Sequence, residues 1–323
     1  MIIPIMIGVI IIVFSISYFM PGDPVQALLG SDYTQEEYDA KAEQIGLTGG
    51  YFEQLGRTFN NLIHGSLGVS YMTLRPVMQV LTQAGQGGSR IWVSIKLGLM
   101  SCILTCILAI PIGIICAVKQ NSVADYTITT VSIFLASMPG FWVALMLIIL
   151  FCQKLQWLPV SGLGSWKAYI LPVVCNAISP LAVTMRMTRS SMLEVIRQDY
   201  VRTARAKGLK EWAVILRHAL KNALIPVITV VGAQFSMVIG GSVIIESIFN
   251  IQGMGQELVT AIGNRDYSEI IGITIILSAF TMIMMLVVDL VYAAVDPRIK
   301  AEFAASGARK RKKKKPEPEG GAA

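Results

Sequence analysis

The stretch QDYVRTARAKGLKEWAVILRHALKNALIPVIT, residues 198–229, is basic, polar and helix-prone, yet apolar runs long enough to cross a bilayer lie on both sides of it. Gly208 stands near the middle of this stretch. A cationic, helical insert between two apolar runs indicates a chain that crosses a membrane and carries a structured segment outside it.

The overall composition agrees with a membrane protein. The chain has 323 residues, of which 54% are apolar and 15% are charged, whereas soluble domains carry nearer a quarter charged residues. A spanning helix needs about 20 mostly apolar residues. Six runs contain no charged residue: 2–20, 97–118, 127–152, 170–185, 223–245 and 270–288. We therefore expect an all-α integral membrane protein with about six transmembrane helices, of which 170–185 is the shortest.

The first run, 2–20, is expected to be a retained helix and not a signal peptide. It lacks a basic flank, its apolar stretch is longer than is usual in signal peptides, and PGDP at 21–24 follows it without a small-residue cleavage site. The five cysteines fall in or at the ends of apolar runs. Without histidine or carboxylate neighbours they indicate packing and not a metal site.

The distribution of charge predicts which segments face the cytoplasm, because lysine and arginine are enriched in cytoplasmic loops. Segment 186–222 has nine basic and three acidic residues, and 309–315 are seven consecutive bases. Segment 21–90 has seven acidic and four basic residues, and 246–269 has four acidic residues and one basic residue. With six spans, the two basic segments share one side and the two acidic segments the other. Both termini are therefore expected to be cytoplasmic.

The outer segment, 21–90, is too long for a simple turn between spans. Helices are expected at 36–44, after Thr34, and at 51–63, where apolar residues recur with a helical period. His64 is assigned no chemistry, because a lone loop histidine is usually a surface polar group. The segment is interpreted either as a cap over the outer mouth or as a docking surface for an external partner, and the two interpretations are compatible.

The basic insert is expected to form an elbow: a helix over 194–207, a left-handed turn at Gly208 and a second helix over 211–224. Each helix has one apolar face among basic residues. Such a hairpin can lie on anionic lipid, which its charge favours. It can instead insert into a soluble partner. The compact shape and the glycine hinge favour the partner, since an anchor on a lipid surface needs no hinge.

The same stretch resembles the coupling segment, often called the EAA loop, of ABC importer permeases, and most of all those of the dipeptide, oligopeptide and nickel branch. The pattern of that branch stands here as DYVRTARAKGL at 199–209 and RHALKNALIP at 217–226. Further similar motifs are PGDP at 21–24, LIHGSLGVSY at 62–71, GGSVIIESIFNIQGMG at 240–255, NRDY at 264–267 and DLVYAAVDPRI at 289–299. The likeness extends over about residues 4–300. QAGQGGSR at 83–90 departs from the more helical lead into the second span that the family shows.

The resemblance implies a transmembrane permease domain over 1–300, with a cytoplasmic coupling loop at 190–224, and a disordered basic tail over 301–323. It implies a bacterial inner (cytoplasmic) membrane location. The implied partners are a second, homologous permease subunit in a heterodimer, two cytoplasmic ATPase subunits, an extracellular or periplasmic solute-binding protein and the lipid bilayer. In this family, ATP-driven closure of the ATPases moves the elbows and switches the bundle between inward-open and outward-open states.

The resemblance also implies two groups of site residues. The residues expected to couple to the ATPases are Tyr200, Arg202, Thr203, Ala204, Arg205, Ala206, Lys207, Gly208 and Leu209. The candidates for an outer gate or docking site are Gly65, Leu67, Gly68, Glu246, Asn264, Arg265 and Asp266.

No catalytic residue, cofactor site, metal site or nucleic-acid partner is expected in this chain. It has no G-x-x-x-x-G-K-[ST] loop, so ATP and Mg are expected on the partner subunits. An ion-coupled secondary carrier needs charged groups deep in the membrane, and none lies near the middle of an apolar run. A membrane scaffold with an elbow that only recruits a soluble protein leaves the outer segment unexplained. The expected cargo is a di- or oligopeptide or a related small solute, with nickel or a metal chelate as the alternative.

Overall fold

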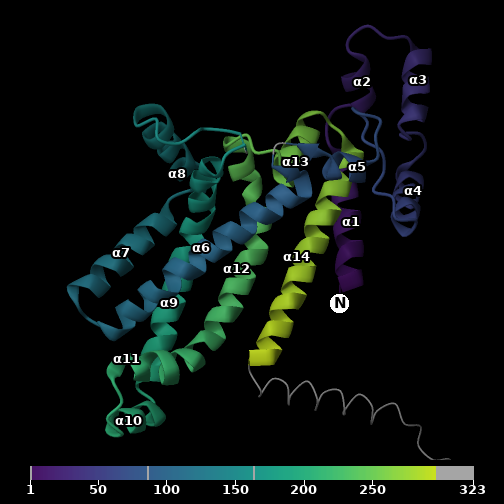
Figure 1. Ribbon diagram of the computed structural model, residues 1–323. Coiled ribbons are helices and arrows are strands. Elements are labelled where there is room, and N and C mark those ends of the chain that lie inside the picture. Colours follow the sequence, from purple (N-terminus) through teal and green to yellow (C-terminus); the bar gives the residue numbers. More distant parts are fainter. Residues whose placement is uncertain (1, 86, 163, 296–323) are drawn as a thin grey trace, which may run out of the picture.

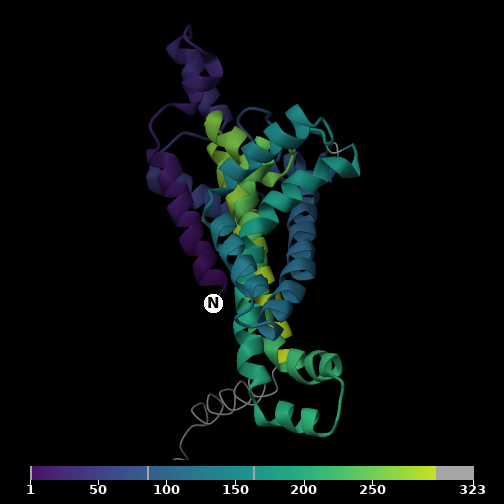
Figure 2. The same cartoon turned by 90° about the vertical axis from the view of Figure 1, so that its left-hand side faces the viewer.

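The structure is a computed structural model and describes residues 2–85, 87–162 and 164–295. It is an elongated bundle of helices (Figure 1). The helices α2, α3, α4 and α13 gather at one end, here called the cap end, and α10 and α11 lie at the opposite end, here called the elbow end (Figures 1 and 2). The basic tail expected at 301–323 lies outside the described residues.

Four of the described helices are long and apolar enough to cross a membrane. They are α6 (Arg90–Val118), α9 (Ile170–Ile196), α12 (Leu220–Ile248) and α14 (Tyr267–Val295). A bent pair of helices makes a fifth candidate span. The run 2–20 forms α1 (Ile2–Phe19), an apolar helix that is shorter than the other spans. The prediction of an all-α membrane protein is confirmed, and the expected count of about six corresponds to these elements.

The bent pair corrects the single helix expected over 127–152. α7 (Val123–Ser137) ends before Pro139, and α8 (Gly140–Leu147) continues into the π-helical turn η1 (Ile148–Lys154) at an angle of 100° to α7. Proline cannot donate a backbone hydrogen bond, and it pushes the preceding residue out of the helical conformation. Met138 is accordingly extended, with φ −78° and ψ 134°.

The shortest apolar run belongs to the most buried span. In α9, 61% of the most apolar window is buried, against 28–33% in α6, α12 and α14. α9 packs against α6, α7, α8 and α12. A helix that faces protein on most sides needs less hydropathy than one that faces lipid, and neighbouring helices can accommodate an internal proline such as Pro180.

The cap end is built from short elements with clear local signals. They are α2 (Pro24–Leu29), α3 (Gln35–Gln44), α4 (Tyr51–Ile63), α5 (Val77–Thr82), strands β1 (Ala84–Gly85) and β2 (Gly88–Ser89), the 3-10 turn η2 (Trp166–Tyr169) and α13 (Met254–Gly263). The helices predicted at 36–44 and 51–63 are confirmed. α3 starts with a complete capping box, in which Thr34 accepts a hydrogen bond from the Glu37 N–H and the Glu37 side chain accepts one from the Thr34 N–H.

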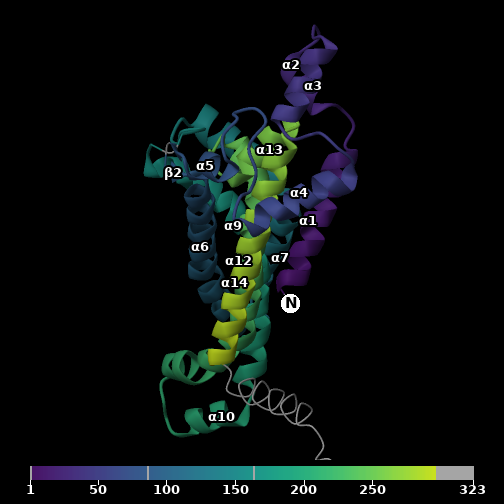
Figure 3. The same ribbon diagram turned by 90° about the vertical axis from the view of Figure 1, so that its right-hand side faces the viewer.

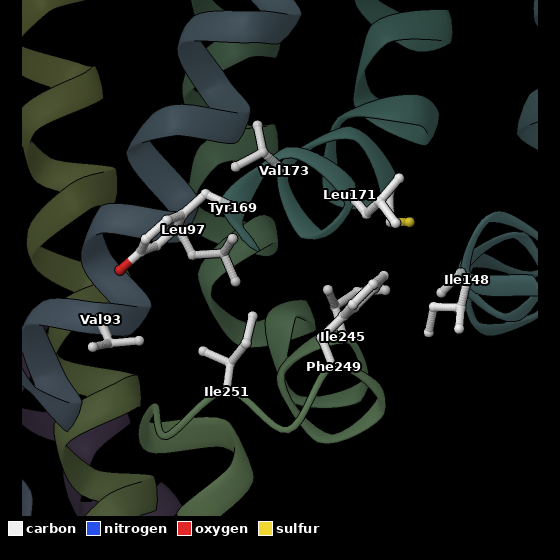
Figure 4. Packing of buried hydrophobic residues seen from close by; sticks show 11 residues of the cluster. Val93, Leu97, Ile148, Tyr169, Leu171, Val173, Ile245, Phe249 and Ile251 are labelled. Carbon is white, nitrogen blue, oxygen red and sulfur yellow. The ribbon is translucent and has the colours of Figure 1, made fainter. Parts of the chain in front are cut away.

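One apolar cluster joins the bundle beneath the cap end. Val93 and Leu97 of α6 lie beside Tyr169, in one cluster with Leu171 and Val173 at the start of α9 (Figure 4). The same cluster contains Ile148 of η1, Ile245 and Phe249 at the end of α12, and Ile251. Four segments that are distant in the sequence therefore share one core, which holds the cap-end elements in register with the spans.

Candidate coupling elbow and cap-end clamps

The elbow is more compact than the sequence predicts. α9 continues to Ile196, and the chain breaks at Gln198, which is extended with φ −71° and ψ 149°. α10 (Asp199–Ala206) follows. The single helix predicted over 194–207 is therefore wrong, because its first residues belong to α9. The break allows α10 to turn away from the axis of α9 and to pack back onto the bundle.

The second arm of the elbow is not a separate helix either. α11 (Glu211–Ala213) passes through the π-helical turn η3 (Val214–Ala219) directly into α12. The helix predicted over 211–224 therefore has no end at 224. Pro226 is accommodated inside α12. The second arm of the elbow is thus continuous with a membrane span.

Gly208 has the predicted left-handed conformation, with φ +76°. Its N–H donates to the Arg205 carbonyl over 2.9 Å and so closes the end of α10. A Cβ at position 208 would contact no other described residue. The glycine is therefore required by its backbone conformation and not by crowding.

An ion pair and a hydrogen bond connect the two arms of the elbow. Arg205 Nη2 lies 2.7 Å from Glu211 Oε1, across the Gly208 turn, and this partner raises the pKa of Arg205. Asn222 Nδ2 of α12 donates to Tyr200 Oη of α10 over 2.8 Å. Both links lie on the surface, where such contacts orient the two arms but add little stability.

The elbow has a buried inner face and an exposed outer face. Val201 and Ala204 of α10 pack with Val214 and Ile215 of η3, and Met192 of α9 belongs to the same cluster. Of the nine predicted coupling residues, only Ala204 is buried, and the other eight are exposed. Val201, at the three-residue spacing that puts it on the face of Ala204, is the packing residue that sequence reasoning missed. Tyr200, Leu209, Trp212 and Leu216 are large, exposed and apolar or aromatic.

At the cap end, Glu246 is a fully buried carboxyl group near the end of α12. Its Oε1 accepts hydrogen bonds from Ser94 Oγ (2.7 Å) and Ser242 Oγ (2.8 Å). Its Oε2 accepts hydrogen bonds from the N–H groups of Gly255 (2.7 Å) and Gln256 (3.2 Å). The last two N–H groups belong to the first turn of α13, where backbone donors lack a helical partner. Glu246 therefore caps α13 from another helix.

Asp266, at the junction of α13 and α14, is another buried carboxyl group. Its Oδ1 accepts from the N–H of Glu269 (3.1 Å), as an N-cap does, and its Oδ2 accepts from Ser70 Oγ (2.7 Å) and the N–H of Met72 (3.2 Å). One side chain thus starts α14 and fixes the loop of the outer segment. A further pair, Arg90 Nε and Glu257 Oε2 at 2.8 Å, ties α13 to the start of α6.

The remaining outer candidates do not form a single site. Gly68, at φ +88°, is so close to Ser268 that a Cβ would collide with its hydroxyl. Arg265, at φ +56°, lies against Gly22 of the PGDP motif. Leu67 packs on α14, Asn264 is the C-cap of α13, and Gly65 lies exposed after α4. Six of the seven candidates therefore lie at one of the two ends of α13 or on the outer-segment loop that Asp266 contacts. Gly65 does not belong to this group.

The PGDP motif links the outer segment to the bundle. Tyr267 Oη donates to the Gly22 carbonyl over 3.1 Å, and Tyr38 Oη of α3 donates to Asp23 Oδ2 over 2.7 Å. The bond to Asp23 raises the pKa of Tyr38 to about 12. Beside these contacts, a cavity of about 710 Å³ lies between the outer segment and the bundle. Among the described residues, no group of three His, Cys, Asp or Glu side chains is placed to hold a metal ion.

The chain belongs to the family described as binding-protein-dependent transport system inner membrane component, which matches residues 109–301. It is 37% identical to the dipeptide transport system permease protein of Alkalihalophilus pseudofirmus, over 93% of this chain and 97% of that one. It is 36% identical to the glutathione transport system permease protein of Escherichia coli strain K12, over 92% and 95% of the two chains. A chain of the inward-facing MetNI methionine ABC transporter has the same fold, with a TM-score of 0.57 and 16% identity over 68% of this chain and 97% of that one.

The predicted membership of the peptide branch of ABC importer permeases is confirmed. The chain is a multi-pass inner-membrane permease subunit of an importer, and ATP hydrolysis belongs to partner subunits. A binding-protein-dependent importer works with a solute-binding protein and with ATPases, so both are partners of this chain.

Proposed function

We propose that the elbow around Gly208 is the element through which the ATPase subunits drive this permease. The supporting observation is its construction: a left-handed turn with linked arms, an inner face packed on α9 and an outer face exposing Tyr200, Leu209 and Trp212. Because the second arm continues into α12, a push on the elbow moves a span as a rigid body. Packed elements that switch between two discrete arrangements can carry coupling between distant sites, and we propose the elbow as such an element.

The transported solute is a di- or oligopeptide or a similar small peptide. The names of the two relatives, a dipeptide permease and a glutathione permease, support a peptide cargo. A second, related permease completes the translocation path as a heterodimer. The solute-binding protein docks at the cap end, where the outer segment and α13 are held by Asp266 and Glu246. Residues 1–300 form the permease domain.

The elbow end faces the cytoplasm, and the cap end faces outward. The nine basic residues of 186–222 support this orientation, since short basic loops stay in the cytoplasm. Both termini are then cytoplasmic. Labelling of single cysteines at the elbow and at the cap end with a membrane-impermeant reagent in intact cells tests the assignment: only the cap-end cysteine should react.

Gly208→Pro is expected to abolish recovery of the ATPases and to reduce uptake to background while the chain stays folded. Proline holds φ near −65° and has no N–H, whereas position 208 needs φ +76° and a hydrogen bond to Arg205. The measurement is a pull-down from native membranes in mild detergent through a tag on this chain, with peptide uptake measured in parallel.

Gly208→Asn is the matched control, because asparagine tolerates the left-handed conformation better than other residues. It should retain both the ATPases and uptake. If Gly208→Pro still recovers the ATPases, the turn is not the coupling element. If even the wild type recovers no ATPase, the elbow does not hold the ATPases and the proposed coupling role fails.

A further inference from the structure

α4, in the outer segment, has two sharply divided faces. At 3.6 residues per turn, its apolar residues fall on one side of the helix and its polar residues on the other. The apolar side contains Tyr51, Phe52, Leu55, Phe59, Leu62 and Ile63, and the polar side contains Glu53, Gln54, Arg57, Thr58, Asn60 and Asn61. A short helix with this division is typical of a segment that lies at a boundary between water and an apolar phase.

Only part of the apolar side is used within the protein. Tyr51, Leu55, Phe59 and Leu62 pack on α1 and α14, in a cluster with Phe14 and Ile271. All residues of α4 are nevertheless at least partly exposed. The helix crosses α1 obliquely near the end of α1 (Figure 3).

The remaining part of the apolar side is exposed. Phe52 is 83% exposed and Ile63 is 80% exposed, and they stand about three turns apart on the same edge of α4. Phe19, at the end of α1, is 73% exposed. The Phe19 ring stacks on Tyr51 with centroids 5.8 Å apart, and Tyr51 meets Phe52 edge-to-face at 5.2 Å. Phe19, Tyr51 and Phe52 therefore form one continuous aromatic surface.

That surface continues the exposed side of α1. Ile12, Ile16 and Phe19 are exposed and share one face of α1, opposite the face with Ile10 and Phe14 that packs inside the protein. Because α1 is apolar along its length, we take its exposed face to be in contact with lipid. The exposed edge of α4 meets this face at Phe19, at the end of the helix, where aromatic side chains are enriched at membrane interfaces.

The polar side of α4 is turned toward the protein segment that leads into it. Arg57 Nη1 donates to Thr48 Oγ1 over 3.1 Å, and Gln54 Nε2 donates to the Gly49 carbonyl over 3.1 Å. Glu53 pairs with Arg57 on the same side. The charged groups of α4 are thus held away from the edge that carries Phe52 and Ile63.

We infer that α4 is an interfacial helix that inserts Phe52 and Ile63 into the lipid of the leaflet at the cap end and so anchors the outer segment to the membrane surface. The occupant of this edge is the bilayer and not a protein, because the edge is continuous with the lipid-facing side of α1 and has no charged side chain. The anchor fixes the height of α2 and α3 above the membrane. It is independent of the coupling role of the elbow.

The test places a nitroxide spin label at Phe52→Cys and, separately, at Ile63→Cys, after the five native cysteines have been replaced. The full chain, with its co-purifying subunits, is reconstituted into lipid nanodiscs. Collision with oxygen, which concentrates in lipid, is compared with collision with a water-soluble nickel chelate. At positions 52 and 63, oxygen should dominate over the nickel complex. Asn61→Cys, on the opposite side of the same helix, is the matched control, and there the order should reverse.

Two outcomes would overturn the inference. If the nickel complex reaches positions 52 and 63 as readily as position 61, the edge faces water. If neither reagent reaches them, a protein covers the edge. Because Phe52 and Ile63 are exposed, neither cysteine should disturb folding, and the two positions report independently. Failure of the coupling proposal would leave the result at α4 unchanged.

Discussion

Arg189→Ala should destabilise this permease by about 3–5 kcal/mol, because it leaves a buried carboxylate without its cation. Asp125, in the first turn of α7, is 1% exposed. Arg189 of α9 holds it with two hydrogen bonds, from Nε to Oδ1 at 2.6 Å and from Nη2 to Oδ2 at 2.7 Å. A fall of several degrees in the melting temperature of the detergent-solubilised chain, with reduced yield from membranes, is the expected measurement.

The double variant Arg189→Leu with Asp125→Asn is the control. Replacing a buried ion pair by uncharged groups often restores stability, and asparagine can still accept the hydrogen bond that Asp125 Oδ2 receives from the Asn121 N–H over 3.0 Å. It should recover most of the loss. If Arg189→Ala melts with the wild type, water reaches the pair and it contributes little.

The position of the Asp125–Arg189 pair, close to the elbow, suggests that it also affects the rate of import. It joins the start of α7 to α9 two turns before α9 ends at Ile196, just above the elbow. A second link, from Arg197 Nη2 to Gln120 Oε1 at 3.3 Å, lies nearby. The double variant should therefore be stable yet import more slowly, since α7 is then less firmly tied to the helix that leads into the elbow. Uptake at equal amounts of membrane-inserted protein separates the two effects.

Local signals in the sequence were enough to predict the elbow turn and the cap-end helices. A glycine after a helix predicts φ > 0, and Gly208 has it. Thr34 and Glu37 form the capping box that begins α3. The bend at Pro139 was also readable, because the residue before a proline leaves the helical region, but the uncharged run concealed it. Hydropathy reports how apolar a run of residues is, and it does not reveal that the helix changes direction within that run.

Other features depend on contacts that no local pattern contains. Residues 194–198 are compatible with a helix, and the break at Gln198 arises because Val201 and Ala204 pack against Met192. Family motifs pointed to Glu246 and Asp266. Their partners Ser94 and Ser70 are 152 and 196 residues away in the sequence, so only the fold reveals the two clamps. The Asp125–Arg189 pair has no signal in a single sequence, since one acid and one base 64 residues apart are ordinary.

Glu246→Ala should release α13 from the bundle and abolish import. The change leaves the buried N–H of Gly255 and the partly buried N–H of Gln256 without their acceptor, at about 1–3 kcal/mol for a fully buried unpaired donor. The hydroxyls of Ser94 and Ser242 lose the same partner. Because α13 joins α12 to Asp266 and the outer segment, its loosening should raise protease sensitivity at the cap end, which limited proteolysis with peptide mapping can measure.

Glu246→Gln separates the shape of the side chain from its accepting oxygens. The amide oxygen can accept hydrogen bonds either from the N–H groups of α13 or from the serine hydroxyls. The amide NH₂ then faces the other set of donors, from which it cannot accept. Intermediate stability and import are therefore expected. Ser94→Ala alone should cost less, because Ser94 Oγ donates one hydrogen bond to Glu246 and accepts one from the Met254 N–H at 2.9 Å. Combined with Glu246→Ala, it should add little further loss, since neighbours in one network are not additive. Fully additive losses would mean that Ser94 and Glu246 hold α13 separately. The description of one hydrogen-bonded network, in which the Glu246 carboxylate joins α6, α12 and α13, would then be wrong.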